Sequence, residues 1–416
     1  MGLACIYIAC RWHCQNLHLF PGEPHLMSFK YPLATSSWDQ DEQDALQRVI
    51  ASDRFSMGDE VAAFEKQFAK HFGAEYAVMV NSGSSANLLM VAALFFSQNL
   101  ELKLNAGDEI IVPAVSWSTT YFPLQQYGLK LKFVDIDAET LNYDLDALAD
   151  AVTDRTRALM VVNLLGNPND FNRLEEITAG RGILMIEDNC ESMGATLGGK
   201  QAGTFGVMGS YSSFFSHHIS TMEGGLVVTD DEALFHIMLS LRAHGWTRNL
   251  PKKNTLTGTK SDDRFEESFK FVLPGYNLRP LEMSGALGQA QLRKLPDLIA
   301  GRRDNAALFQ DKMRDHPVFS IQKEIGESSW FGFSLIVRES ANITRKQAIA
   351  SLTSAGFECR PIVTGNFAKN EVLKYFNYEV HGDLKNANYL DQNGLFIGNH
   401  HFPIRDAVEA LAEVTI

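Results

Sequence analysis

Short apolar runs that alternate with helical patterns through the first half of the chain constrain its fold more than any other feature. Each run is short enough for a buried strand, and turn residues or a helical pattern follow it. Strands that alternate with helices pair in parallel and are covered on both faces, so we expect an α/β fold with a mostly parallel central sheet. The expected strands are Tyr76–Val80, Glu109–Val112, Lys130–Asp135, Ala158–Leu164 and Gly182–Glu187.

Helical patterns flank this region on both sides. Asp39–Ser52 and Gly58–Phe72 precede the first expected strand, with apolar residues at three- and four-residue intervals. Beyond about Pro280 the strand–helix alternation gives way to mixed segments. A helical stretch, Leu281–Leu298, leads to these mixed segments, such as Trp330–Val337 and Arg345–Ala355. We therefore expect a large domain over residues 27–280 and a smaller α+β domain over residues 281–416.

The first 26 residues differ from the rest, because they have neither a helical nor a strand period. Met27 begins a segment that reads like the start of a domain. We expect translation to begin at Met27 and residues 1–26 to be a non-native extension; the alternative is a genuine but poorly ordered arm. Cys10, His13 and Cys14 lack a second ligand pair at a useful spacing, so no metal site is expected there.

Charge and cysteine content exclude several classes of protein. Lys and Arg number 37 against 50 Asp and Glu, a net charge of −13, which argues against a general nucleic-acid binder. No apolar run reaches the roughly 18–20 residues needed to cross a bilayer. Apart from Cys5, Cys10 and Cys14, only two isolated cysteines occur, which is no disulfide framework, so we expect a soluble protein of the reducing cytoplasm.

A Gly/Ser turn follows the first expected strand. Residues 81–87 read Asn-Ser-Gly-Ser-Ser-Ala-Asn and lead into an apolar helix expected over Leu88–Phe96. Free N–H groups and the helix dipole at such a turn bind phosphate. The turn lacks the lysine of a Walker loop, and many turns of this kind only cap a helix, so both interpretations stay open.

Two further polar segments follow expected strands. Trp117 lies among small polar residues after Glu109–Val112, where an indole can stack on a planar cofactor or simply cover the rim of the core. Asp188 and Glu191 follow Gly182–Glu187, at the sheet edge where α/β proteins bind ligands. A carboxylate there can hold a protonated ring nitrogen, or it can cap the next helix.

Two adjacent histidines, His217 and His218, follow an aromatic pair and precede Glu223-Gly224-Gly225. Neighbouring side chains point in different directions, so a shared metal ion is not expected. One of the two is a candidate general base, because a histidine pKa lies near working pH.

These four motifs, in this order, resemble the DegT-type sugar-nucleotide aminotransferase family of pyridoxal phosphate (PLP) fold type I, from roughly Tyr31 to the C-terminus. The resemblance implies an aspartate-aminotransferase-like fold. It also implies that Gly83, Ser84 and Ser212 bind the cofactor phosphate, that Trp117 stacks on the ring, that Asp188 pairs with the pyridine nitrogen, and that Glu191 lies close to the ring.

The family's cofactor-binding lysine lies six residues before the Glu of Glu-Gly-Gly, and in this chain that position holds His217. No lysine occurs between Lys200 and Lys252. The resemblance therefore implies PLP or pyridoxamine phosphate (PMP) held without a covalent bond, and His217 as the catalytic base with His218 as the alternative. Family members with histidine here resemble 3-dehydratases of 4-keto-6-deoxy sugar nucleotides.

One branch of these dehydratases carries an iron–sulfur cluster on four cysteines, and only Cys190 and Cys359 lie in the matching region. The cluster-free branch acts on GDP-4-keto-6-deoxy-D-mannose on the way to colitose, an O-antigen sugar. Segments such as SHHISTMEGG and ECRPIVTGNF look like that branch. The implied reaction is C3 dehydration, with L-glutamate regenerating PMP and with release of ammonia.

The resemblance also implies a homodimer whose active sites are shared, with Asn277 reaching the neighbouring cofactor phosphate. Further candidates for contact with the substrate are Phe55, Ser56, Met57, Arg248, Arg279 and Glu358; for each arginine, a surface or dimer ion pair is the alternative. Arg242, His244 and Trp246 have no assigned role. The competing functions are dehydration of another nucleotide-linked 4-keto-6-deoxy sugar, a sugar aminotransferase, and a non-catalytic regulator with this fold.

Overall fold

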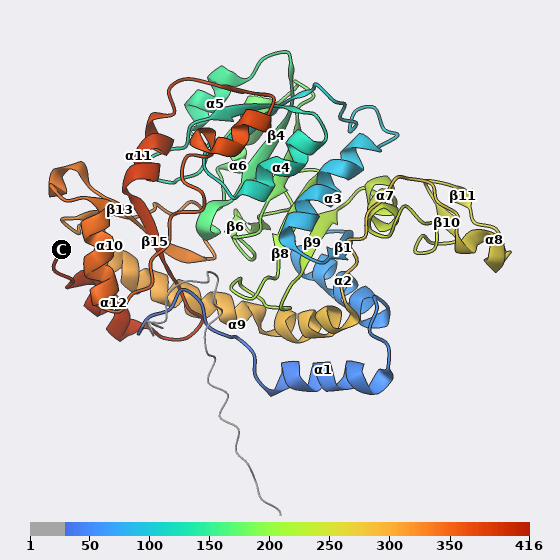
Figure 1. Cartoon of the computed structure of the whole chain (residues 1–416), viewed down its shortest axis with the longest axis horizontal. Helices are drawn as coiled ribbons and strands as arrows, with labels where there is room; N and C mark the ends of the chain where they lie inside the picture. The colour runs from blue at the N-terminus through green and yellow to red at the C-terminus, as the bar shows by residue number, and fades with distance from the viewer. Residues whose placement is uncertain (1–29) are drawn as a thin grey trace, which may run out of the picture.

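The computed structural model describes residues 30–416, which form a large sheet and a small sheet with helices packed around both (Figure 1). The expectations for residues 1–26 and for a start at Met27 fall outside this range. Within residues 30–416, no helix combines the length and the apolar character that a membrane span requires.

The large sheet has eight strands, and five of its seven strand pairs are parallel. Only β9 runs against its neighbours, so the predicted α/β fold with a mostly parallel sheet is confirmed. Across the sheet the order is β1 (Tyr76–Val80), β9 (Gly225–Thr229), β8 (Met208–Ser212), β5 (Leu184–Asp188), β4 (Thr156–Val162), β2 (Glu109–Pro113), β3 (Lys130–Val134) and β14 (Tyr378–Val380).

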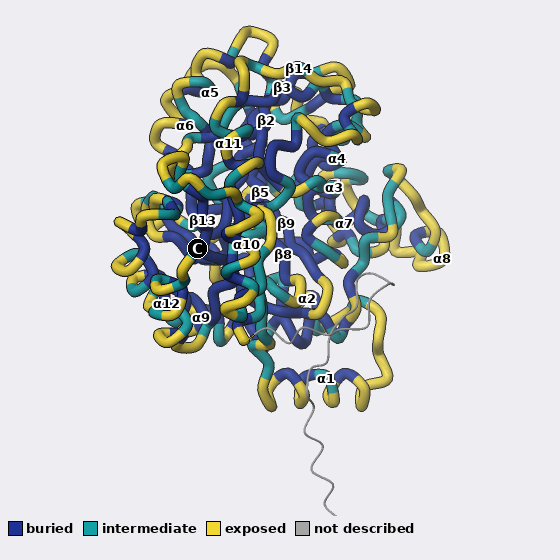
Figure 2. The backbone as a smooth tube through the Cα atoms, turned by 60° about the vertical axis from the view of Figure 1, so that its left-hand side comes forward, coloured by how far each residue is buried: buried dark blue, intermediate teal, exposed yellow. Residues whose placement is uncertain are grey.

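Successive residues of each strand point to opposite faces of this sheet. In β1, Val78 and Val80 join one apolar core, while Ala77 and Met79 join another. Apart from the edge strand β14, which is partly exposed, the strands are largely buried from both sides and appear mostly dark blue in Figure 2. Residues of α3 (Gly83–Phe95), α4 (Ser118–Gln126), α7 (Glu232–Arg242) and α11 (Lys385–Asn393) cover the first face. Residues of α2 (Asp59–Phe72), α5 (Leu145–Ala151), α6 (Phe171–Thr178) and α9 (Glu282–Met313) cover the second.

The small sheet is antiparallel and has its own apolar core. Its strands are β12 (Phe319–Ser320), β13 (Gly332–Val337) and β15 (Gly394–Gly398). The end of α9 packs on it together with α10 (Arg345–Ser354) and α12 (Arg405–Ala412). Tyr31 also belongs to this core, and its hydroxyl donates to the Gly398 carbonyl at 2.8 Å.

Helix α9 joins the two parts, because its first half packs on α1 (Gln40–Ser52) and α2 and its last turns pack on the small sheet (Figure 1). Strand β14 returns from the C-terminal half of the chain to the edge of the large sheet. Phe367 and Leu390, also from this half, lie in the core of the large sheet. The domain boundary near residue 280 stays a prediction.

The expected helices differ from the observed ones at two places. The helix expected over Leu281–Leu298 continues to Met313, and the other difference concerns the cavity wall. The helix expected over Leu88–Phe96 begins at Gly83, so the Gly/Ser turn is itself the first turn of α3. Ser82 is the N-cap, and its hydroxyl accepts from Ser85 N at 3.1 Å. The remaining short elements are β6 (Thr196–Leu197), β7 (Lys200–Gln201), β10 (Lys253–Asn254), β11 (Gly258–Thr259) and α8 (Arg264–Ser268). The last three project from the body of the protein (Figure 1).

Candidate active site

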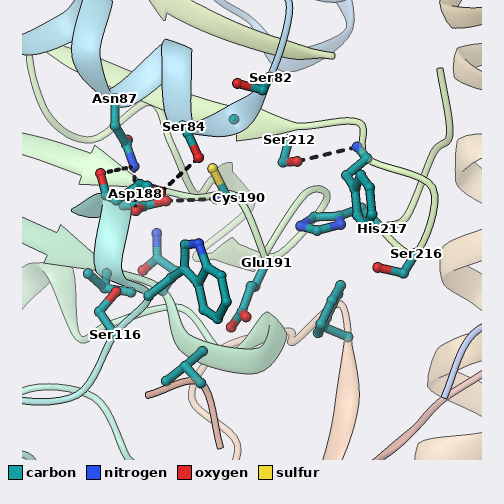
Figure 3. A pocket seen from close by; sticks show the side chains of 18 of the residues that line it. Ser82, Ser84, Asn87, Ser116, Asp188, Cys190, Glu191, Ser212, Ser216 and His217 are labelled. Carbon is teal, nitrogen blue, oxygen red and sulfur yellow. Dashed lines mark hydrogen bonds between the residues drawn. The ribbon is translucent and has the colours of Figure 1, made fainter. Parts of the chain in front are cut away.

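A cavity of about 500 Å³ lies where β1, β2, β4, β5 and β8 end. These strands are parallel to one another, so their carboxyl ends meet at one edge of the sheet, the edge where α/β proteins bind ligands. Figure 3 views this cavity closely. Its lining residues are Ser82, Gly83, Ser84, Asn87, Ser116, Trp117, Thr119, Val162, Asn163, Asp188, Cys190, Glu191, Ser212, Phe214, Ser216, His217, Glu223, Phe331, Arg360, Pro361, Val363 and Phe396.

The N-terminus of α3 forms one wall of the cavity. Within residues 30–416, the backbone N–H groups of Gly83 and Ser84 have no hydrogen-bond partner, and both residues line the cavity. A Cβ on Gly83 would lie 2.7 Å from the Ser212 Cβ and 3.0 Å from the Cys190 Sγ, so only glycine fits there. This wall therefore presents free donors and the positive end of a helix dipole to an anion.

Asp188 is buried at the end of β5 and is held from two sides (Figure 3). Its Oδ2 accepts from Asn87 Nδ2 at 2.8 Å and from Thr120 Oγ1 at 2.7 Å. Its Oδ1 accepts only from the Cys190 backbone N–H, at 3.2 Å. Oδ1 therefore keeps acceptor capacity for a protonated ring nitrogen.

Trp117 and Glu191 both line the cavity. Trp117 is 56% exposed, so a large part of its surface is open to a bound group. Burial, and to a lesser extent the nearby Asp188 carboxylate, raises the pKa of Glu191 to about 7, although the Leu165 N–H donates to its Oε2 at 3.0 Å and acts in the opposite direction. Near neutral pH the Glu191 carboxyl therefore holds a proton part of the time and can donate a hydrogen bond to a bound oxygen.

The two histidines have different surroundings. His217 lines the cavity, and its ring packs 5.1 Å from the Phe331 ring, centroid to centroid. His218 is buried behind it, with Nε2 at 3.1 Å from the Ser329 carbonyl oxygen. Burial, and secondly Arg302, lowers the pKa of His217 to about 4, so its imidazole is neutral at working pH. Only His217 has the position and the protonation state of a base that faces this cavity.

The other predicted contacts lie outside the cavity of this chain. Asn277 is exposed and accepts from Arg279 Nε at 3.0 Å. The Arg248 guanidinium lies 4.3 Å from the centre of the Trp246 ring. Residues 55–57 lead into α2, and Phe55 is 45% exposed. Their roles toward the substrate stay predictions.

Glu358 also lies outside the lining, but it forms an ion pair at 3.0 Å with Arg360, which does line the cavity. Sequence reasoning did not select Arg360, although it lies in the segment ECRPIVTGNF. It also missed Asn87 and Thr120, the partners of Asp188. Asn87 had a visible signal, since it is a polar residue at the start of an apolar helix.

Arg242 has a structural position. Its Nη1 donates to the Met79 carbonyl at 2.6 Å, and it forms a buried ion pair with Glu65. It therefore ties α7 to β1 and α2. The rings of His244 and Trp246 pack against each other at a tilt of 57° with centroids 4.7 Å apart, outside the cavity.

These residues fit a PLP-type cofactor. The free N–H groups of α3 suit a phosphate, Trp117 offers an exposed ring face, and Asp188 keeps an acceptor free for the pyridine nitrogen. No lysine occurs among the cavity-lining residues of the described chain, and the His217 ring projects into the cavity (Figure 3). A cofactor here would be held without a covalent bond.

Comparison with known proteins gives consistent results. The model of the DegT/DnrJ/EryC1/StrS aminotransferase family matches residues 36–413. A GDP-4-keto-6-deoxy-D-mannose 3-dehydratase of Escherichia coli O55:H7 is 64% identical over 92% of this chain and 99% of its own length. The structure of an E. coli GDP-4-keto-6-deoxy-D-mannose-3-dehydratase with bound hydrated PLP covers 93% of this chain and 99% of its own, with 63% identity and a TM-score of 0.91.

A third similar protein is a variant of GDP-4-keto-6-deoxymannose-3-dehydratase whose structure contains GDP-perosamine. It is 63% identical, covers 92% of this chain and 100% of its own, and has a TM-score of 0.91. The predicted family and the predicted fold class are therefore confirmed.

Proposed function

The chain belongs to the DegT/DnrJ/EryC1/StrS aminotransferase family, and we propose that it is a lyase that removes the C3 hydroxyl of GDP-4-keto-6-deoxy-D-mannose. The product is GDP-4-keto-3,6-dideoxy-D-mannose, a precursor of colitose for O-antigen and lipopolysaccharide synthesis. One observation carries the proposal. A neutral histidine, His217, faces the cavity where the family has a lysine, and no lysine lines the described cavity.

The cofactor is PLP, converted to PMP by L-glutamate and held without a covalent bond. When bound, PMP supplies an amine for the C4 ketone of the sugar and a ring that stores electrons during elimination. Gly83 and Ser84 hold the phosphate through backbone N–H groups, and the Ser212 hydroxyl lies on the same wall. Asp188 keeps the ring nitrogen protonated, and Trp117 covers one ring face.

His217 moves the proton. Its neutral imidazole accepts a proton from the C4′ carbon of the cofactor, and the resulting imidazolium donates it to the departing C3 hydroxyl, which leaves as water. A lysine at this position would offer a nucleophilic amine, which an aminotransferase requires. The elimination leaves an enamine, and after its release and hydrolysis the products are ammonia and a 3-deoxy sugar.

We further propose a homodimer that shares its active sites. Asn277, Phe55, Ser56, Met57, Arg248 and Arg279 lie outside the cavity of their own chain, so they are available to a neighbouring one. Glu358 orients Arg360 at 3.0 Å, and both are assigned to the substrate. Mixing His217→Asn and Asn277→Ala chains tests this arrangement, because a mixed dimer keeps one intact site only if the site is shared. Restored activity supports sharing, and two inactive chains that stay inactive on mixing contradict it.

We assign the reaction to the cytoplasm. The thiols of Cys190 and Cys359 are free in the structure, and Cys190 lies in the cavity. Free thiols next to a reactive site suit a reducing compartment.

The decisive experiment measures ammonia release with GDP- and CDP-linked 4-keto-6-deoxy sugars in parallel, with PMP and L-glutamate present. We expect ammonia and a 3-deoxy product from the GDP-linked sugar. An amino sugar would indicate an aminotransferase, turnover of the CDP sugar alone another dehydratase, and no reaction a binding protein. His217→Asn should abolish turnover while PMP stays bound.

A further inference from the structure

Arg302 of α9 is a buried cation without a carboxylate partner. Arg302 is 7% exposed, and no acidic side chain of residues 30–416 lies within ion-pair distance of its guanidinium. Its Nη1 donates to the carbonyls of Asn399 at 2.6 Å and Phe331 at 3.2 Å. Its Nε is buried without a partner in the same part of the chain. An unpaired buried charge is costly, so its retention calls for a role.

Arg302 is connected to His217 through Phe331. The guanidinium holds the Phe331 carbonyl, and the Phe331 ring packs 5.1 Å from the His217 ring and 5.8 Å from the His218 ring. Asn399 completes the clamp, since its Nδ2 donates to the Arg302 carbonyl at 3.0 Å. The ends of β13 and β15 are thereby fixed behind the candidate base.

The charged groups around His217 have opposite effects on the protonation of its imidazole. Asp188 and Glu191, from the end of β5, and Glu223, from the loop before β9, share the cavity with it and favour an imidazolium. Arg360 on the cavity wall and Arg302 behind the ring disfavour one. Burial comes first and Arg302 second among the causes that lower the His217 pKa, and both also act on His218.

We propose that Arg302 is a positioning residue for proton transfer: it fixes the Phe331 ring against His217, and its buried charge keeps the His217 imidazole unprotonated. The proposal rests on the proposed function, because only a base needs this protonation state. A resting imidazolium could not accept the proton from the cofactor. A neutral residue at 302 would leave the nearby carboxylates opposed by Arg360 but no longer by the Arg302 charge.

The test is an NMR titration of ¹³C-histidine-labelled protein loaded with PMP and free of sugar, with the His217 signal assigned by its absence from His217→Asn. We compare Arg302→Gln, which keeps an amide donor for the Phe331 and Asn399 carbonyls, with Arg302→Lys, which keeps the charge. Arg302→Gln should raise the His217 midpoint by about one pH unit. Arg302→Lys should leave the midpoint near its wild-type value, even where the altered donor lowers kcat.

Arg303→Gln is the matched control, one residue further along α9. Arg303 Nε donates to the Ser328 carbonyl at 2.9 Å, but its side chain is 36% exposed and Glu327 lies 4.0 Å away. Water and this carboxylate screen its charge, so the His217 midpoint should not move.

An unchanged midpoint in folded, PMP-loaded Arg302→Gln overturns the proposal, as does an equal rise in Arg302→Lys. If Arg302→Gln does not fold, a rise in Arg302→Lys alone overturns it, and an unchanged midpoint supports it. The titration needs no turnover, so its failure is distinct from a failure of the ammonia assay.

Discussion

Gly83→Ala tests whether the N-terminal wall of α3 binds the cofactor phosphate. The added Cβ would lie 2.7 Å from the Ser212 Cβ, a contact that real Cβ atoms do not make, and 3.0 Å from the Ser212 Oγ. The Ser212 Cβ is fixed to β8, so α3 or β8 must move. Overpacking of this size costs about 1–3 kcal/mol. Movement of α3 also displaces its N–H groups, and a loss of about 1.4 kcal/mol in phosphate contacts weakens PMP binding about tenfold.

A double-mutant cycle with Ser212→Gly identifies the cause. Ser212→Gly alone removes the hydroxyl that accepts from the Phe214 N–H at 3.3 Å, and it adds chain freedom worth about 0.5–1 kcal/mol. In the double variant the clash with the Ser212 side chain is gone, so the loss in free energy of unfolding should be about 1 kcal/mol smaller than the sum of the single losses. Urea unfolding and PMP titration by fluorescence measure both quantities. If the loss in the double variant equals the sum of the two single losses to within about 0.5 kcal/mol, the steric argument is refuted.

Two further predictions concern the cavity. Because burial raises the pKa of Glu191 to about 7, above the usual value of about 4.3, the folded protein retains a proton that the unfolded chain releases. The contribution of Glu191 to the free energy of unfolding of the cofactor-free protein should therefore fall as the pH rises from about 5 to about 7, and Glu191→Gln should remove that part of the slope in a urea series; an unchanged slope contradicts this. Trp117→Ala should change the free energy of unfolding by no more than about 0.5 kcal/mol, because the side chain is 56% exposed, yet weaken PMP binding about tenfold. The control Trp330→Ala, at a residue 3% exposed, should cost about 3–5 kcal/mol of stability, and a Trp117→Ala loss of that size would mean that the indole supports the core.

Local sequence signals predicted the elements whose causes are local. The alternation of short apolar runs gave five strands of the large sheet to within two residues at most of their ends. The Asp39 cap of α1 is similarly local, since it forms a capping box with Glu42. The start of α3 was placed late because its first turn lacks apolar residues, and the Ser82 cap was interpreted as part of a loop. Strand β14 was missed because only its pairing with β3 defines it.

The residues of the site also divide into those that local sequence signals predicted and those that tertiary packing brings in. Asp188 ends a strand, and Gly83, Trp117 and His217 lie in the segments that follow strands, so their spacing along the chain was informative. Arg302 gave no such signal, because it lies in the middle of a long helix and reaches the histidines only through tertiary packing. Sequence spacing indicates which strand ends carry polar residues. The residues that shift the protonation of these groups come from segments far away in the chain.

The surroundings of position 217 explain why an imidazole suits it. The site is buried and lies close to the uncompensated charge of Arg302, two conditions that disfavour any cation there. A free lysine ammonium at 217 would meet the same burial and the same like charge. An imidazole avoids this cost at rest, since it is neutral at working pH, and it carries a positive charge only between accepting and returning one proton. The carboxylates of Asp188, Glu191 and Glu223 then face that transient charge across the cavity. Arg302 and these acids thus act at different moments of one proton transfer, the first on the resting base and the others on its protonated form.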